Sequence, residues 1–422
     1  MDAALTLKPA ISQTERLIFL DWVRIIAFAM LVFYHVGMYY VTWEFHIKSP
    51  HANNLLEPWM RLSSPWRMDL LFLVSGAATS FMLLRQGASG ALLQQRARRL
   101  LIPLLFGMLV IVPPQSWLEV TQKLGYEGGY FDFMRLYLSG YKGFCFTPGR
   151  CLILPTWNHL WFLPYLFGYT LLLWCWLRWQ PKLPDQLAAW FDTNVKSGLL
   201  LLLPILFLTL TRLLLRDQFP VTYALVDDWF SHSQYFAMFL LGAALARTQL
   251  VWPRMAQLRW MALLVALLAW GLLVQAQWLA QVANVPMRAI SPVIYCVQQW
   301  CAIVAALGFA QTCLNQDSTA RRYLTEAVFP VYILHQTLII LLAHGLAPLK
   351  LDVALEGGLI VLLTFMLSLA AFEAVRQVRW MRPLFGLQET RRVQLVNAPN
   401  PNGSPGLPRD PAQRSVEKAA KD

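Results

Sequence analysis

The chain has 422 residues, of which 57% are apolar and only 14% are charged. Soluble domains average about 25% charged residues, so the composition excludes an ordinary soluble protein of two or three domains. The formal net charge of +12 could suggest a nucleic-acid partner. The basic residues gather beside long apolar runs, however, and this distribution indicates a membrane and no nucleic acid.

Apolar runs of about 20 residues, long enough to cross a bilayer, recur along the chain. The first is too long for the apolar part of a signal peptide and has no small-residue cleavage site after it, which predicts an uncleaved span. The sequence therefore predicts an all-α, polytopic membrane helix bundle of about ten transmembrane helices. They are expected at roughly 17–40, 68–84, 100–117, 158–177, 198–215, 232–250, 258–280, 289–314, 327–347 and 357–376.

The Lys and Arg residues near the span ends predict the orientation. They are more numerous on the segments that are cytoplasmic when the N-terminus is cytoplasmic, and ten spans return the C-terminus to the same side. We expect a cytoplasmic N-terminal segment at 1–16 and a transmembrane domain at 17–385. The segment 386–422 is rich in Asn, Pro, Ser and charge, which predicts a disordered cytoplasmic tail.

The first span contains three ionisable residues, Asp21, Arg24 and His35. A charge inside a span costs about 2.5–3.5 kcal/mol and usually marks function or a buried pair. Arg24 and His35 are eleven residues apart, so they lie on one helix face, about 16 Å apart along the axis. Either this face links the two sides of the membrane, or Arg24 pairs with Asp21 and His35 is a hydrogen-bonded bundle residue.

The ionisable residues at the start of the second span and just before the third span each have two possible interpretations. Asp69 is expected at the depth of His35, where a carboxylate would hold the imidazole tautomer. Alternatively, Asp69 and Arg67 form an interfacial anchor. The arginines that precede the third span are either a topology signal or a grip for the phosphates of a cytosolic cofactor. These arginines are Arg96, Arg98 and Arg99.

Two further segments place polar side chains inside spans. His159 and Trp161 begin the fourth span on the outer side, where Trp161 suits an aromatic belt. Tyr332 and His335 in the ninth span share one helix face, and we expect them in the cytoplasmic half.

The cysteines and the first external loop give weaker signals. Cys145 and Cys151 lie in one external segment and form either a disulfide in an oxidising compartment or two free thiols. Glu44, His46 and His51 do not match a closed zinc pattern, and no metal site is predicted.

Five segments in order form a recognisable set. They are Phe19-Leu20-Asp21-Trp22-Val23-Arg24 with Phe33-Tyr34-His35, Arg67-Met68-Asp69-Leu70-Leu71-Phe72-Leu73-Val74-Ser75-Gly76, Arg96-Ala97-Arg98-Arg99-Leu100-Leu101-Ile102-Pro103, His159-Leu160-Trp161-Phe162-Leu163 and Tyr332-Ile333-Leu334-His335. Together they resemble the acyltransferase 3 family of multi-span membrane O-acyltransferases. Within it the chain is most similar to the glucan biosynthesis protein C group, the periplasmic glucan succinyltransferases. The resemblance covers about residues 15–385.

The resemblance implies an inner-membrane enzyme that moves an acyl group from cytosolic acyl-CoA to a hydroxyl of a glycan on the periplasmic side. Acyl-CoA is a donor substrate, and no permanently bound cofactor is expected. The acyl group (acetyl, succinyl or longer) and the acceptor (periplasmic glucan, lipopolysaccharide, capsule or a small lipid) stay open.

Roles follow for the matching residues. His35 is expected to act as general base or, alternatively, as a transient acyl carrier, so activity should fall as the pH drops below the usual imidazole value of about 6.5. Asp69 or a neighbour would orient His35. Arg24 and the three arginines before the third span would hold the coenzyme phosphates or polarise the thioester. Tyr332 and His335 would line the donor side, while Arg67, His159 and Trp161 would bind the acceptor.

A secondary transporter or exporter of an anionic metabolite is the alternative function. It would use the same intramembrane arginine and histidine residues as substrate and proton sites. A transporter built from inverted repeats would show an internal repeat or paired broken spans in its two halves. The sequence shows neither, which argues against this alternative.

Overall fold

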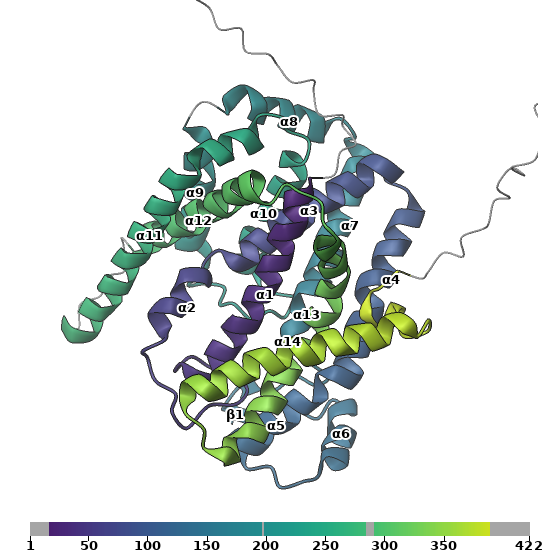
Figure 1. Ribbon diagram of the computed structural model, residues 1–422, viewed down its shortest axis with the longest axis vertical. Coiled ribbons are helices and arrows are strands. Elements are labelled where there is room, and N and C mark those ends of the chain that lie inside the picture. Colours follow the sequence, from purple (N-terminus) through teal and green to yellow (C-terminus); the bar gives the residue numbers. More distant parts are fainter. Residues whose placement is uncertain (1–16, 196–197, 284–290, 389–422) are drawn as a thin grey trace, which may run out of the picture. The chain divides into compact units, whose positions relative to one another are not determined.

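The computed structural model describes residues 17–195, 198–283 and 291–388. The predicted segment 1–16 and nearly all of the predicted tail lie outside the described residues. The described part consists mainly of α-helices, with one short hairpin (Figure 1). The helices are α1 (Ile18–Tyr40), α2 (Glu57–Ser63), α3 (Arg67–Gln86), α4 (Gly90–Phe106), α5 (Pro113–Leu124), α6 (Tyr130–Leu138), α7 (Phe162–Trp179), α8 (Leu183–Asn194), α9 (Leu199–Leu215), α10 (Trp229–Leu245), α11 (Val251–Ala283), α12 (Ser291–Cys313), α13 (Thr319–Leu346) and α14 (Val353–Gln377).

The expectation of ten spans is not confirmed. Among the described residues, seven helical segments are long and apolar enough to cross a membrane, and two bent helix pairs raise the number to at most nine. One pair joins Gly90–Ile111 to Pro113–Leu124 with a bend of 41°, at a proline that cannot donate a backbone hydrogen bond. The predicted span at 232–250 corresponds to α10, which has 17 residues and is not among these candidate spans.

The short helix α10 packs closely against α3. Gly76 on α3 lies against the backbone of α10, because a Cβ at this position would collide with the carbonyl oxygen of Phe239. A Cβ at Gly242 on α10 would collide in the same way with the carbonyl oxygen of Leu73. Small residues at facing positions allow two helix backbones to approach closely inside a membrane. This contact holds α10 against the helix that begins with Arg67.

Helix α1 lies in the middle of the bundle, between α3 and α13 (Figure 1). Asp21 on α1 forms a buried ion pair with Arg321 on α13. Fourteen residues further along each helix, His35 contacts His335. Fourteen residues advance a helix by about 21 Å, so α1 and α13 run parallel and in register over that length.

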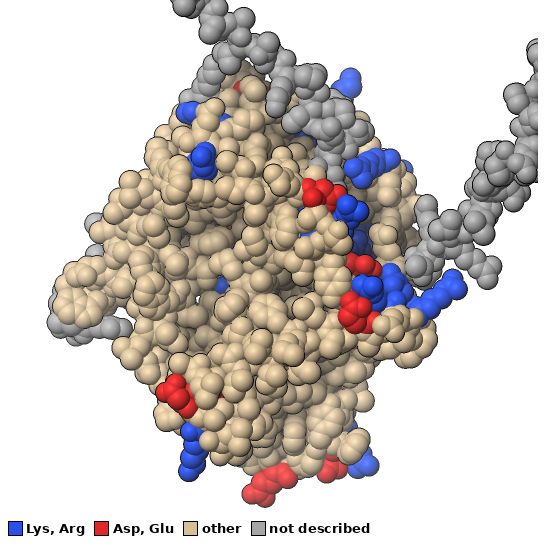
Figure 2. Space-filling model, viewed as in Figure 1, with Lys and Arg blue, Asp and Glu red and all other residues tan. Residues whose placement is uncertain are grey.

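Apolar side chains cover the outside of the bundle. Helices α9, α11 and α14 expose rows of large residues, among them Leu206, Leu213, Trp260, Leu268 and Leu362. Figure 2 shows the charged side chains mainly near two ends of the visible face, with a mostly uncharged surface between them. Such a surface suits lipid and would be costly in water, so this is a multi-pass membrane protein.

The external segment that contains Cys145 and Cys151 forms a small cap. It contains α5, α6 and a hairpin of β1 (Cys145–Thr147) and β2 (Arg150–Cys151). Cys145 and Cys151 form a disulfide, the first of the two alternatives. The cap has its own apolar cluster, and the hydroxyl oxygen of Tyr137 lies 2.8 Å from the carbonyl oxygen of Met108 and 3.0 Å from that of Thr156. These contacts fix the cap on the bundle.

Candidate active site

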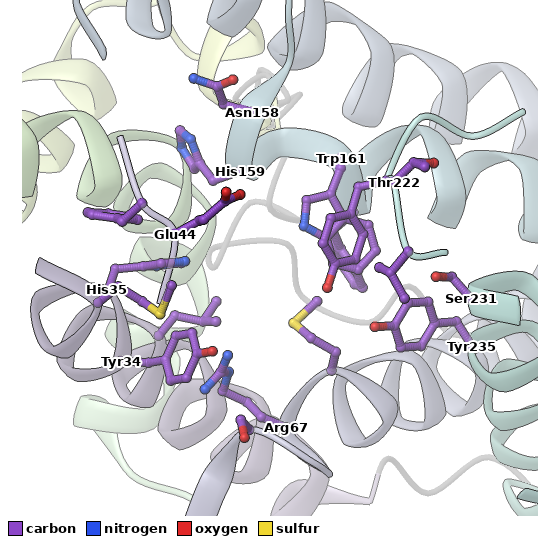
Figure 3. A pocket seen from close by; sticks show the side chains of 18 of the residues that line it. Tyr34, His35, Glu44, Arg67, Asn158, His159, Trp161, Thr222, Ser231 and Tyr235 are labelled. Carbon is purple, nitrogen blue, oxygen red and sulfur yellow. The ribbon is translucent and has the colours of Figure 1, made fainter. Parts of the chain in front are cut away.

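A cavity of about 610 Å³ lies between the helices near the end of α1. Side chains from α1, α3, α5, α9, α10, α12 and α13 line it, together with the loop after α1 and the turn before α7. Figure 3 shows two sides: His35 and His159 on one, and Trp161 with Tyr235 on the other. The cavity thus brings together polar residues that are hundreds of positions apart in the chain.

The histidine side is organised by a pair of imidazoles. The Nδ1 atom of His35 lies 3.0 Å from the Nε2 atom of His335. The Nδ1 atom of His335 lies 2.7 Å from the carbonyl oxygen of Tyr332, so this nitrogen carries the hydrogen and donates it. In a neutral ring the other nitrogen is then an acceptor. His335 therefore accepts the Nδ1 hydrogen of His35, which leaves the Nε2 lone pair of His35 free.

His335 stands behind His35. His35 lines the cavity, whereas His335 is not among the lining residues and is 1% exposed. The expectation that Tyr332 and His335 lie in the cytoplasmic half, away from His35, is therefore wrong for His335. Helix register explains the difference, because α1 and α13 run in parallel and bring His35 and His335 to one level. Tyr332 also lines the cavity.

His159 belongs to the same cluster. It lies in a single helical turn (Asn158–Trp161) before α7 and is buried. Its Nε2 atom donates to the carbonyl oxygen of Ile333 at 3.0 Å, and the Tyr332 hydroxyl donates to the carbonyl oxygen of His159 at 2.8 Å. The His159 ring meets the His335 ring edge-on, with centroids 5.1 Å apart. His159 and His335 thus both donate hydrogen bonds to backbone carbonyl oxygens of α13.

A further histidine, His46, lines the cavity from the loop after α1 and contacts Glu119. The Nδ1 atom of His46 lies 2.5 Å from a carboxylate oxygen of Glu119, and Glu119 also accepts from Lys123 at 2.8 Å. The Nε2 atom of His46 lies 2.9 Å from the side-chain nitrogen of Gln336. The sequence offered His46 only as a residue that matches no closed zinc pattern, so its contact with Glu119 was not predicted.

Asp69 is held by a different network from His35. Its carboxylate accepts a hydrogen bond of 2.9 Å from Gln299, which also donates to Gln234. Asp69 lines the cavity, yet the contact that orients the His35 ring comes from His335. The simple anchor between Arg67 and Asp69 is not formed either, because the Arg67 guanidinium stacks on the ring of Tyr34 at 3.7 Å.

Aromatic rings form the opposite side of the cavity. Trp161 stacks on Tyr223 with ring centroids 4.3 Å apart and lies 5.5 Å from Tyr235. Tyr223 was not expected, because it comes from the loop between α9 and α10, which contains no apolar run. Flat rings beside hydrogen-bonding groups make a surface that accommodates a sugar.

The predicted arginines gather at the opposite end of α1. Arg24 lies 3.7 Å from Asp21, which is also paired with Arg321; the interfacial pair is therefore formed. Arg96 is buried, and its guanidinium donates to the hydroxyls of Thr79 at 2.8 Å and Thr170 at 3.5 Å.

The three arginines before the predicted third span differ in exposure. Arg98 is exposed, Arg99 is half-buried and Arg96 is buried. The charges of Arg99 and Arg24 are close enough to act on Arg96. Within the described part of the chain, Arg96 forms no ion pair with a carboxylate, unlike Arg24 and Arg321. A buried cation whose protein partners are neutral hydroxyls suits an anion from outside the chain.

A family model described as an acyltransferase domain matches residues 17–373. The match includes every residue that lines the cavity and the arginine group around Arg96. No curated protein matches the chain, and no solved structure matches it.

Proposed function

The chain belongs to the acyltransferase 3 family, and we propose that it carries an acyl group from cytosolic acyl-CoA to a glycan hydroxyl on the other side of the membrane. The acceptor would be a periplasmic or cell-surface glycan, as in the periplasmic glucan succinyltransferases that its motifs resemble. The membrane would be the inner membrane, with the N-terminus in the cytoplasm.

The His35–His335 pair carries this proposal. A general base needs a free lone pair that faces the substrate and a partner that holds its ring. The hydrogen-bond chain from His35 to His335 to the Tyr332 carbonyl supplies both, since it directs the hydrogen of His35 away from its Nε2 atom.

In the proposed reaction His35 acts as the general base. The Nε2 atom takes the proton of the acceptor hydroxyl, and the oxygen attacks the thioester carbonyl. The carbon–sulfur bond breaks, and the proton on His35 passes to the departing thiolate of the coenzyme. The charge that His35 gains is spread toward His335 through their hydrogen bond, so no carboxylate beside His35 is required.

The two ends of α1 suit the two substrates. Arg24, Arg96 and Arg99 lie at its beginning, where the many phosphate charges of the coenzyme would bind, with Arg98 exposed nearby. The cavity with His35, His159 and Trp161 lies toward its end, beside the cap. The disulfide in the cap supports an oxidising compartment on that side. An acyl chain would pass from one end to the other along α1.

The test is an acyl-transfer assay with the full chain in liposomes. Acyl-CoA is added to one side and a glucose oligosaccharide to the other, and free coenzyme A and esterified oligosaccharide are measured. We expect His35→Ala to lower kcat by about a hundredfold or more, because a general base contributes about 10²–10⁴. His51→Ala, in an exposed position of the loop after α1, is the matched control with unchanged kcat.

Two results would contradict the proposal. If correctly folded His35→Ala retains full transfer, His35 is not the base. If the wild type moves an anionic metabolite across the bilayer unchanged and forms no ester, the chain acts as a transporter.

A further inference from the structure

Three arginines line the cavity, and Figure 3 shows one of them, Arg67, beside Tyr34 between the histidine side and the aromatic side. Arg67 begins α3, Arg212 lies near the end of α9, and Arg216 directly follows α9. Arg67 is 4% exposed and Arg212 is 8% exposed, whereas Arg216 is exposed at the edge. We call these three residues the arginine wall.

The two buried guanidinium groups rest on aromatic rings instead of carboxylates. The guanidinium carbon of Arg212 lies 3.5 Å from the ring centre of Tyr295 and 5.7 Å from that of Phe230. Arg67 stacks on Tyr34 in the same way, and its Nε atom is buried without a hydrogen-bond partner. In the part of the chain that the structure describes, none of the three arginines forms an ion pair within 4.0 Å.

The nearby negative charge does not balance the wall. Asp69 also lines the cavity, and its charge and that of Arg212 act on each other. The carboxylate of Asp217 acts on Arg216, so two carboxylates lie beside three cations. The other acidic residues of the cavity are on the histidine side, where Glu119 is bonded to His46 and Lys123. Glu44 lies beside His35 and His159 in Figure 3.

A buried arginine is costly unless something compensates its charge. Stacking on a ring orients the guanidinium plane and leaves its edge free to bind a carboxylate or phosphate through two hydrogen bonds. The wall lies next to the rings of Trp161, Tyr223 and Tyr235. A ligand that stacks on these rings would therefore place an attached anionic group against Arg67 and Arg212.

We propose that the arginine wall is an anion subsite for a carboxylate or phosphate that belongs to the acceptor or to the transferred acyl group. The inference rests on the proposed function, because that function assigns the coenzyme phosphates to the arginines at the other end of α1. It narrows the substrate class: at least one of the two substrates carries a negative charge in the cavity beyond those of the coenzyme.

Binding measurements test the subsite without requiring catalysis. The full-length protein in detergent is titrated calorimetrically with a linear glucose pentasaccharide and with the same pentasaccharide carrying one phosphate ester. A second pair of titrations compares acetyl-CoA with succinyl-CoA, which differ by one carboxylate. We expect the charged member of one pair to bind about ten- to a hundredfold more tightly, as one or two charge-assisted hydrogen bonds provide.

Substitutions identify the residue responsible. Arg212→Gln should abolish the preference for the charged ligand, and Arg212→Lys should keep part of it because the charge remains. Arg178→Gln is the matched control, since Arg178 also stacks on a ring, that of Trp174 at 4.9 Å, but lies outside the cavity. Equal melting temperatures of the variants would exclude misfolding as the cause.

The outcomes separate the proposals. A preference for the phosphorylated pentasaccharide places the anion on the acceptor, and a preference for succinyl-CoA places it on the acyl group. If neither pair shows a preference, or Arg212→Gln retains it, the subsite is wrong. A preference that depends on Arg212, in a protein that forms no ester, would overturn the proposed function and leave the subsite standing.

Discussion

The His35 and His335 rings meet through their Nδ1 and Nε2 atoms, 3.0 Å apart, on two helices that run parallel. The same two helices are joined fourteen residues earlier by the buried pair of Asp21 and Arg321. Two polar contacts at equal spacing fix the register between α1 and α13, because a shift by one residue would break both. The ion pair therefore helps to place His335 behind His35.

His335→Ala should lower kcat while it leaves the KM of the acceptor nearly unchanged. The substitution removes the acceptor for the Nδ1 hydrogen of His35. The His35 ring can then rotate, and its Nε2 lone pair is no longer held toward the acceptor hydroxyl. A misplaced catalytic group costs up to about a hundredfold in rate. Steady-state kinetics of ester formation in liposomes measure the effect.

His335→Gln provides the discriminating control. A glutamine carbonyl can accept the His35 hydrogen, so this variant should recover part of the lost kcat, which a merely structural role would not explain. His344→Ala changes an exposed histidine of the same helix and should have wild-type kinetics. Equal activity of His335→Ala and wild type would refute the orienting role.

The sequence predicted the helical membrane architecture because a span of about 20 apolar residues is a local signal. The predicted runs at 17–40, 258–280 and 357–376 correspond to α1, α11 and α14. The run at 232–250 was misleading, because its apolar length continues past the end of α10 at Leu245.

The site was predictable in its parts but not in its pairings. An ionisable residue inside an apolar run is visible locally, which identified His35 and Asp69, and a basic cluster before a span identified Arg96. Which residue faces which depends on helix register across 300 positions, as for His35 and His335. For this reason the partner assigned to His35 was Asp69.

Arg96→Gln should raise the KM for acyl-CoA about tenfold or more. The buried guanidinium has two threonine hydroxyls as neutral partners, so a phosphate would be its counter-charge, and a hydrogen bond to a charged group is worth about 1.5–3 kcal/mol. Isothermal titration with coenzyme A measures the affinity directly. Arg322→Gln, at an exposed arginine paired with Asp317, is the control; equal affinity of all three proteins would exclude Arg96 from the donor site.

The stability contributed by Lys48 should depend on pH. Its Nζ atom donates to the carbonyl oxygens of Met38 and Val41 near the end of α1. Burial and the charge of Lys123 lower the pKa of Lys48 to about 8, from 10.5. The folded state therefore binds fewer protons than the unfolded state between pH 8 and 10.5, so this group makes the protein more stable as the pH rises through that window.

The comparison with Lys48→Met isolates this effect from other titrating groups. The difference in melting temperature between wild type and Lys48→Met should change in favour of the wild type as the pH rises from 8 to 10. A difference that is constant over this range would show that the pKa of Lys48 is not lowered in the folded protein.

Gly242→Ala should destabilise the bundle by separating α10 from α3. The added methyl group would collide with the carbonyl oxygen of Leu73, which belongs to the backbone and cannot rotate away. Overpacking of this kind typically costs about 1–3 kcal/mol. Because Ser231, Gln234 and Tyr235 on α10 line the cavity, the separation should also raise the KM of the acceptor.

Gly271→Ala on α11 is the matched control: nothing lies within 4 Å of its added methyl group, and alanine favours a helix over glycine by about 1 kcal/mol. Thermal unfolding in detergent should therefore show a lower midpoint for Gly242→Ala and an equal or higher one for Gly271→Ala. Equal midpoints for the two variants would mean that the two helix backbones are not in contact at Gly242.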